Sequence, residues 1–297
     1  MFGKLGLGLG LGAQVGGLLP ETKAYIARVE TTGGVVMSKT KANADITLLK
    51  TSGIYDAIIA AGQGFCWTAS AGVKIDTTIG IDTISRIYNM VPITETPANY
   101  DYAQGTKEAQ PPWANNLIVF TGDTHYLLSE SAGLGIANGI TNLTAFAVFK
   151  HVSTPAATGY IFAAINASGQ SIRTGFGRSK SKHMVAVSNN DGLPEVYASA
   201  GDMISATAIV QTVKIVFGDG SGSYNIRENG TEVFANASLL NIIPATNPHS
   251  IKIGNLLPPT ASRSPKINMS ALIVLPFAVS DAVRNAIEAH LLSVYGG

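Results

Sequence analysis

Charged residues are scarce in this sequence. Lys, Arg, Asp and Glu make up 13% of its 297 residues, whereas an ordinary soluble domain carries roughly 25%. The net charge is +1, so the chain has no basic field for a nucleic acid backbone, and we expect no nucleic-acid partner. Low charge also gives little repulsion between copies, which favours self-association.

Cysteine is almost absent, since Cys66 is the only one. An internal disulfide and a CxxC-type zinc site are therefore excluded, and the neighbours Phe65 and Trp67 predict a buried apolar role for the thiol. The histidines show no i, i+2 or i, i+4 pairing, and the sequence has no G-x-S-x-G motif. These absences predict no metal site, no cofactor and no serine-hydrolase centre.

Long hydrophobic runs are also missing. The apolar opening, Leu5 to Gly12, is too short to span a bilayer, half of it is glycine, and no signal-type cleavage site follows. Alternation of leucine and glycine places the leucines on one face of an extended strand. Because ordering glycine is entropically expensive, residues 1–19 are predicted to form an extended arm that becomes ordered only against other subunits. Its anchoring side chains would be Phe2, Leu5, Leu7, Leu9 and Leu11.

Helical patterns are confined to the two ends of the chain. Residues 20–64 predict a helical hairpin that begins at Pro20, has a second helix capped by Ser38 or Thr40, and is interrupted at Gly53. A hairpin of this size is too small to be stable alone and must pack on something else. A further helix is predicted over 280–295, with Ser280 as its cap, Gly296 at its end, and a buried stripe of Val283, Ile287, Leu291 and Val294.

Between these helices the chain consists of short apolar or alternating runs separated by Gly, Asn, Asp, Pro and Ser. Asn229-Gly230, between two alternating segments, predicts a type I′ hairpin turn, and Asp219-Gly220 with Gly222 marks a second hairpin. About a dozen such strands indicate a β-sandwich or jelly roll over residues 65–297.

The order of these parts resembles a known architecture. "GYIFAAINASGQSIRTGFG", "VKIVFGDGSGSYNIRENGTEVFANA", "SIKIGNL" and "SALIVLPFAVSDAVRNAIEAHLLSVYG" resemble the laminin-G-like, concanavalin A-like jelly roll. The upstream "AYIARVETTGGVV" and "QGTKEAQPPWANNLIVFTGDTHYL" are similar to the helical lead and first strands of such domains in tailed-bacteriophage virion proteins. The resemblance covers residues 21–297. It implies a mainly β fold, a concanavalin A-like sandwich with an N-terminal arm, helical hairpin and C-terminal helix.

The resemblance also implies a function. The first hypothesis is a structural, non-enzymatic component of a phage particle (a tail or head appendage, fibre or decoration protein), located on the virion surface. It would be held by its arm to other virion subunits, assemble as a homo-oligomer such as a trimer, and display its sandwich outward for adhesion to host-surface glycan. The alternatives are a stand-alone lectin-like carbohydrate-binding module and a glycoside hydrolase.

Two departures from related sandwiches bear on these alternatives. The Glu-x-Asp-x-Glu strand motif of the glycosidase members is missing, and Glu228 and Glu232 straddle the predicted Asn229-Gly230 turn, where a solvated hairpin is expected. Other members bind calcium through Asp and Asn oxygens in loops at the rim of the sandwich. The candidate residues here are turn residues, and we favour the interpretation that their side chains hydrogen-bond to their own backbone. These residues are Asp123, Asn189, Asn190 and Asp191.

Aromatic side chains supply the candidate glycan contacts, because a sugar ring has apolar C–H faces that stack on them. Burial in the sandwich core is the competing role for each. The candidates are Tyr100, Tyr102, Trp113 and Tyr126. The basic cluster from Gly177 to His183 is predicted to be a solvated loop, with contact to an acidic glycan or a partner chain as the alternative.

Overall fold

The structure, a computed structural model, describes residues 17–78, 80–93, 101–120, 124–129, 141–153, 158–165, 172–179, 182–188, 194–198, 207–242, 251–254 and 265–296. The predicted anchor residues of the arm, Phe2 to Leu11, lie outside these ranges. The described helices are α1 (Pro20–Thr31), α2 (Lys39–Thr51), α3 (Ile54–Ala61), α4 (Asp281–Tyr295) and a short 3-10 helix, η2 (Lys107–Ala109).

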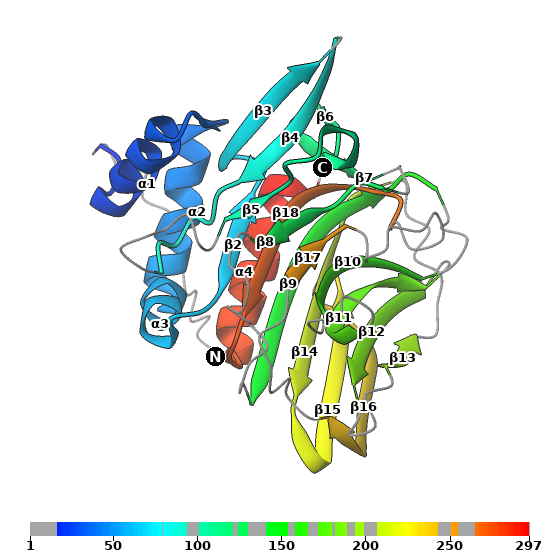
Figure 1. Cartoon of the computed structure of the whole chain (residues 1–297). Coiled ribbons are helices and arrows are strands. Elements are labelled where there is room, and N and C mark those ends of the chain that lie inside the picture. Colours follow the sequence, from blue (N-terminus) through cyan, green and yellow to red (C-terminus); the bar gives the residue numbers. More distant parts are fainter. Residues whose placement is uncertain are drawn as a thin grey trace.

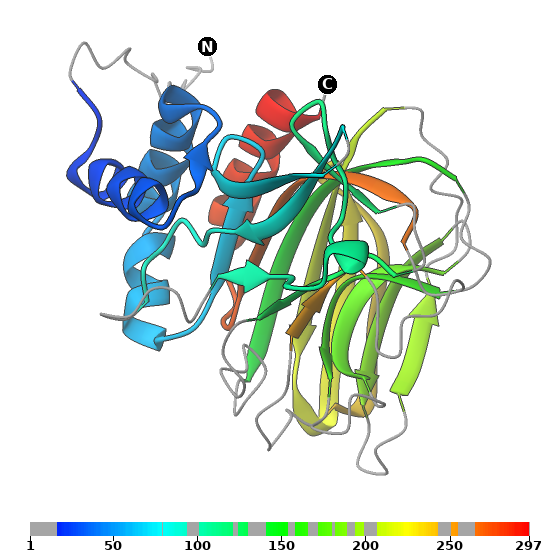
Figure 2. The same cartoon turned by 45° about the horizontal axis from the view of Figure 1, so that its top comes forward.

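Two antiparallel sheets face each other, as predicted for a mainly β sandwich (Figure 1; Figure 2). Sheet A has ten strands, in the spatial order β1 (Val35–Val36), β3 (Gly72–Thr78), β4 (Ile81–Ile87), β5 (Tyr102–Ala103), β8 (Leu127–Ser129), β17 (Ile251–Ile253), β10 (Thr158–Ile165), β11 (Ile172–Ser179), β12 (Lys182–Ser188) and β13 (Pro194–Ala198). Sheet B follows the order β16 (Thr231–Ile242), β15 (Gly218–Glu228), β14 (Ile209–Val216), β9 (Asn142–His151), β18 (Ile267–Leu275), β7 (Leu117–Phe120) and β6 (Trp113–Ala114), and β2 (Phe65–Thr68) also pairs with β18.

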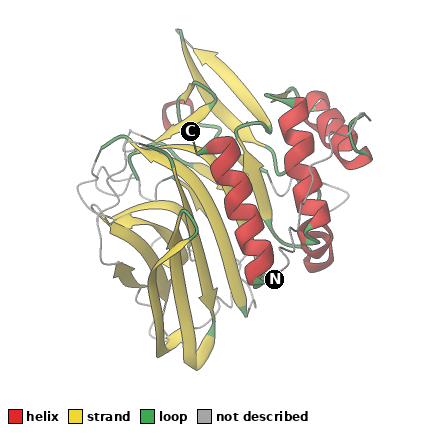
Figure 3. Cartoon of the chain, turned by 180° about the vertical axis from the view of Figure 1, so that it is seen from behind, coloured by secondary structure: helices red, strands yellow, loops and turns green. Residues whose placement is uncertain are grey.

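The central strands of sheet B are covered on both faces. In β9 every residue from Leu143 to Phe149 is buried, and β18 is nearly as apolar. Sheet A lies on one side of these strands, and α4 packs against β9, β14 and β18 on the other, as Figure 3 shows from behind. A strand covered twice has to be apolar at every position, which explains the continuous apolar runs of these two segments.

The predicted signals for helix ends and for the tight turn are confirmed. Ser38 caps α2 by accepting from the Lys41 N–H, and Ser280 caps α4 by accepting from the Val283 N–H. Asn229 and Gly230 both have positive φ, 50° and 81°, as a type I′ turn requires. The other predicted turn differs, because Asp219, Gly220 and Gly222 lie within β15.

The predicted helical hairpin contains three helices, because Gly53 adopts a left-handed conformation and separates α2 from α3. The helices pack into the core of the sandwich, as expected for a hairpin too small to be stable alone. Tyr25 and Ile46 belong to the same buried cluster as Phe65 of β2 and Leu291 of α4. On α4, Ile287 and Leu291 are buried as predicted, whereas Val283 and Val294 are half-buried and Glu288 is buried instead.

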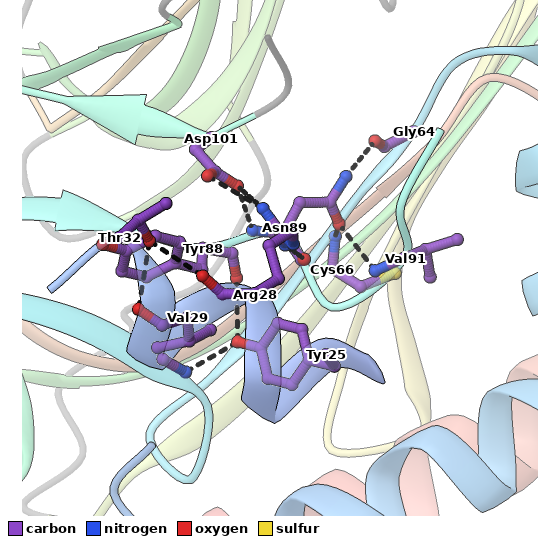
Figure 4. A network of polar contacts seen from close by, with 11 residues as sticks. Tyr25, Arg28, Val29, Thr32, Gly64, Cys66, Tyr88, Asn89, Val91 and Asp101 are labelled. Atoms are coloured by element: carbon purple, nitrogen blue, oxygen red, sulfur yellow. Dashed lines mark hydrogen bonds and ion pairs between the residues drawn. The ribbon is translucent and has the colours of Figure 1, made fainter. Parts of the chain in front are cut away.

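A buried polar network holds α1 to the sandwich (Figure 4). The Arg28 guanidinium donates to both carboxylate oxygens of Asp101 at 3.0 Å and to the Asn89 carbonyl. Asn89 donates its backbone N–H to Asp101 and its side-chain amide to the Gly64 carbonyl. Tyr25 adds a link to sheet A, because its hydroxyl accepts from the Gly72 N–H at 2.6 Å. Since each charge has a partner, this network can be buried without an isolated ion.

A second polar network joins α2 to α4. The carboxylate of Asp45 accepts from the hydroxyls of Thr68, Ser70 and Tyr295, at 2.8, 2.7 and 2.5 Å. Its other oxygen lies 2.7 Å from Nε2 of His290. One buried side chain therefore connects an N-terminal helix, the end of β2 and the C-terminal helix.

Candidate functional site

The outer face of the middle of sheet A lies away from the strands on which α1 and α4 pack, and η2 lies beside it at Tyr126. Helix contacts to sheet A are concentrated at β1 and β3, and those to sheet B at β9, β14 and β18. Figure 1 shows β10, β11 and β12 with no described helix in front of them. The outward residues of β17 and β10 on this side are nevertheless buried, as at Lys252 and Ala163.

Lys252 lies at the centre of that face. In β17 the alternation of side chains sends Ile251 and Ile253 into the core and Lys252 to the outer side. Its partners in register are Leu128 of β8 and Ala163 of β10, and Gly175 of β11 follows Ala163 across the sheet. Lys252 is nevertheless only 1% exposed.

The ammonium of Lys252 has no counter-ion in the described part of the chain. Its Nζ makes no hydrogen bond there and lies 3.9 Å from the ring centroid of Tyr126. Burial lowers the pKa of Lys252 to about 7. A buried cation that lacks both water and a carboxylate is energetically unfavourable, and the aromatic face replaces only part of the lost hydration.

Buried amide side chains position Tyr126. Gln104 donates to the Tyr126 carbonyl at 3.4 Å, and the Tyr126 N–H donates to the carbonyl of Ala109 in η2 at 3.1 Å. Gln110 in turn donates to the Gln104 carbonyl and to the carboxylate of Asp76, both at 3.0 Å. The Tyr126 side chain stays half-buried, so part of the residue remains accessible beside Lys252. We call Lys252 and Tyr126 the Lys252 site.

The other predicted glycan contacts are not brought to this place. Tyr102 is 3% exposed and packs edge-on against Phe65, with ring centroids 4.5 Å apart, so its assignment as a glycan contact is wrong. Trp113 is half-buried in β6, at the edge of sheet B. Tyr100 lies outside the described residues. Of the four candidates, Tyr126 alone is described on the outer side of sheet A, beside Lys252.

The carboxylates of the β15–β16 hairpin do not form a pair. Glu228 binds His183 of the facing sheet, with Oε2 and Nε2 2.6 Å apart, and this hydrogen bond lowers the pKa of Glu228. Glu232 instead accepts from Asn225 within its own sheet. The expectation of a wholly solvated hairpin and loop is therefore corrected at two residues, since Glu228 is only half-exposed and His183 is buried between the sheets.

Metal ligands are not clustered in the described ranges, where no three His, Cys, Asp or Glu side chains could hold an ion. The turn residues considered for calcium, Asp123 and Asn189 to Asp191, lie outside those ranges. Cys66 is buried as predicted, and burial raises the pKa of its thiol. Among the described helices, none is both long and apolar enough to cross a membrane.

No protein-family model matches the chain, and no curated protein sequence does either. Solved structures with a similar arrangement include the CBM40 domain of a Ruminococcus gnavus IT-sialidase, at 13% identity and a TM-score of 0.39, covering 50% of this chain and 83% of that domain. A heptameric SAP-like pentraxin from Limulus polyphemus has 14% identity and a TM-score of 0.39, covering 57% of this chain and 80% of the pentraxin. Trypanosoma rangeli sialidase has 12% identity and a TM-score of 0.49, covering 84% of this chain and 39% of the sialidase. At these levels the likeness carries no argument about ligand or activity.

Lys252 is the residue that sequence reasoning missed. Its segment, "HSIKIGNL", carries the alternation of a strand, and a lysine between two isoleucines in such a strand ordinarily faces water. The unusual feature is its burial without a partner, which depends on the segments that surround β17 in the fold.

Proposed function

We propose that this protein is a non-catalytic carbohydrate-binding module whose ligand face is the outer side of sheet A around the Lys252 site. One observation carries the proposal: a partly exposed aromatic residue and an unpaired cation lie together on the outer side of sheet A, away from the strands on which α1 and α4 pack. An aromatic ring can stack on the C–H face of a sugar, while a charged group nearby fixes its polar edge.

In the described part of the chain, the carboxylates of the β15–β16 hairpin are not paired, which supports binding over hydrolysis. Glycosidases of the ordinary kind need two carboxyl groups on either side of the scissile bond, and Glu228 and Glu232 have partners in different places. We expect no release of reducing ends from any polysaccharide that the protein binds. Measurable turnover that survives purification would contradict the non-catalytic part of the proposal.

A glycan array with the full chain tests the binding itself. Binding should be lost in Tyr126→Ala and retained in Tyr126→Phe, because phenylalanine keeps the ring face without the hydroxyl. Trp113→Ala is the matched comparison, since it removes a half-buried aromatic from sheet B. Loss of binding in Trp113→Ala with full binding in Tyr126→Ala would show that the ligand face lies elsewhere.

Attachment to a phage particle is a second proposal, and it rests on the sequence. The low charge content and the alternating Leu/Gly opening favour a segment that binds neighbouring subunits. Deleting Leu5 to Leu11 should abolish incorporation into particles and leave glycan binding unchanged. Normal incorporation of the deleted chain would argue against an anchoring arm.

A further inference from the structure

We infer that the ligand of the Lys252 site is an acidic sugar, whose carboxylate or other anionic group pairs with the Lys252 ammonium. This inference rests on the proposed function and adds the chemical class of the ligand. The starting observation is that Nζ is buried yet makes no hydrogen bond in the described part of the chain. Two partly buried cations among the described residues are paired, Arg28 with Asp101 and Arg227 with Glu288.

The surroundings of Lys252 supply no internal acid. Its register partners, Leu128 and Ala163, are apolar, and Tyr126 is the titratable group described against Nζ. Burial accounts for the lowered pKa without a contribution from a neighbouring charge. The Lys252 ammonium would therefore be stabilised by an anion, and no described residue of the chain supplies one.

The residues next to Lys252 on one side are small and buried, so a ligand reaches Nζ only if Tyr126 moves. Ala163 of β10 and Gly175 of β11 follow Lys252 across the sheet, so the surface on that side has one methyl group and one residue without a side chain. If the Tyr126 ring moves away from Nζ, the Lys252 ammonium becomes exposed beside Ala163 and Gly175. In this arrangement the anion takes the place of the aromatic face as the partner of Nζ, and the sugar ring packs on Tyr126.

The inference predicts acid-favoured binding. Only the protonated amine pairs with an anion, so the affinity for an acidic sugar should be greatest below pH 7. It should fall by up to about tenfold per pH unit above pH 7, over the range in which the bound anion keeps the amine protonated. Above pH 7 binding should therefore take up a proton, which calorimetry in two buffers of different ionisation enthalpy measures directly.

The test uses the full chain and pairs of ligands that differ in one group. Each acidic glycan of an array is compared with its methyl ester, and the best pair is then titrated by calorimetry. We expect the acid to bind at least tenfold more tightly than the ester. Lys252→Met should abolish this difference, and Lys150→Met, which removes an exposed lysine from β9 of the other sheet, should preserve it.

The outcomes separate the two proposals. Equal binding of acid and ester by the native protein, unchanged in Lys252→Met, would overturn the inference and leave the carbohydrate-binding function standing. Binding of no glycan at all would overturn the proposed function. Thermal unfolding of Lys252→Met confirms that the variant is folded, because loss of a buried charge should raise its melting temperature.

Discussion

At the scale of single residues, Lys252 should weaken the fold that contains it. The unfolded chain holds the Lys252 proton at neutral pH, whereas burial lowers the pKa of the folded group to about 7. Lys252→Met keeps a side chain of similar length without the charge and should raise the free energy of unfolding at pH 7 by roughly 1–3 kcal/mol. Urea unfolding of both proteins measures this difference.

The pH dependence has a definite sign. Between pH 7 and about 10.5 the unfolded state binds the proton that the native amine has lost, so the native protein gains stability as the pH rises. The advantage of Lys252→Met should therefore be largest at pH 7 or below and shrink toward pH 10. A constant difference across that range would show that Lys252 titrates normally in the folded protein, and Lys150→Met gives the baseline for an exposed lysine.

Residue identities allowed some of this to be predicted. Cys66 lies in the core, as its apolar neighbours predict, whereas the choice of Tyr126 as a glycan contact stays a prediction. Lys252 and the pairing of His183 with Glu228 could not be predicted, since both depend on segments that the fold brings together from distant parts of the sequence.

At the scale of elements, the end of α4 offers a local test. Ser280 accepts from the Val283 N–H at 3.3 Å and satisfies one of the otherwise unpaired donors at the start of the helix. Ser280→Ala should lower the free energy of unfolding by about 1 kcal/mol. Ser293→Ala, an exposed change in the last turn of the same helix, should be close to neutral, and equal losses in both variants would contradict a specific capping role.

The element boundaries that the sequence predicts are those set by residues close together in the chain. The caps at Ser38 and Ser280, the break at Gly53 and the Asn229-Gly230 turn all depend on residues within a few positions of one another. The order of the strands had no such signal. β17 lies between β8 and β10 through pairing of Lys252 with Leu128 and Ala163, and hydrophobic alternation specifies a face of a strand without naming its neighbour.

At the scale of the whole molecule, Asp45 links the two ends of the chain. Asp45→Ala would leave the hydroxyls of Thr68, Ser70 and Tyr295 without their shared acceptor. We expect a loss of about 3–5 kcal/mol, as for removal of one member of a buried charged network. Hydrogen exchange should also accelerate throughout α4, because its contact with α2 is lost.

Asp56→Ala is the control for this change. Asp56 forms an exposed ion pair with Lys50, and such pairs contribute little to stability. Similar losses in the two variants would mean that Asp45 has no special part in joining α2 to α4.

Contacts between early and late parts of the chain, namely Asp45 with Tyr295 and β2 and β9 with β18, affect how the protein is synthesised. Asp45 and Tyr295 are 250 positions apart, so at roughly 5–20 residues per second the ribosome needs about 12–50 s to make the second after the first. During that time α2 has emerged without its final partner, and sheet B lacks the strand that lies between β9 and β7. A nascent chain stalled before residue 267 should therefore expose the apolar surface of β9 and bind chaperones strongly.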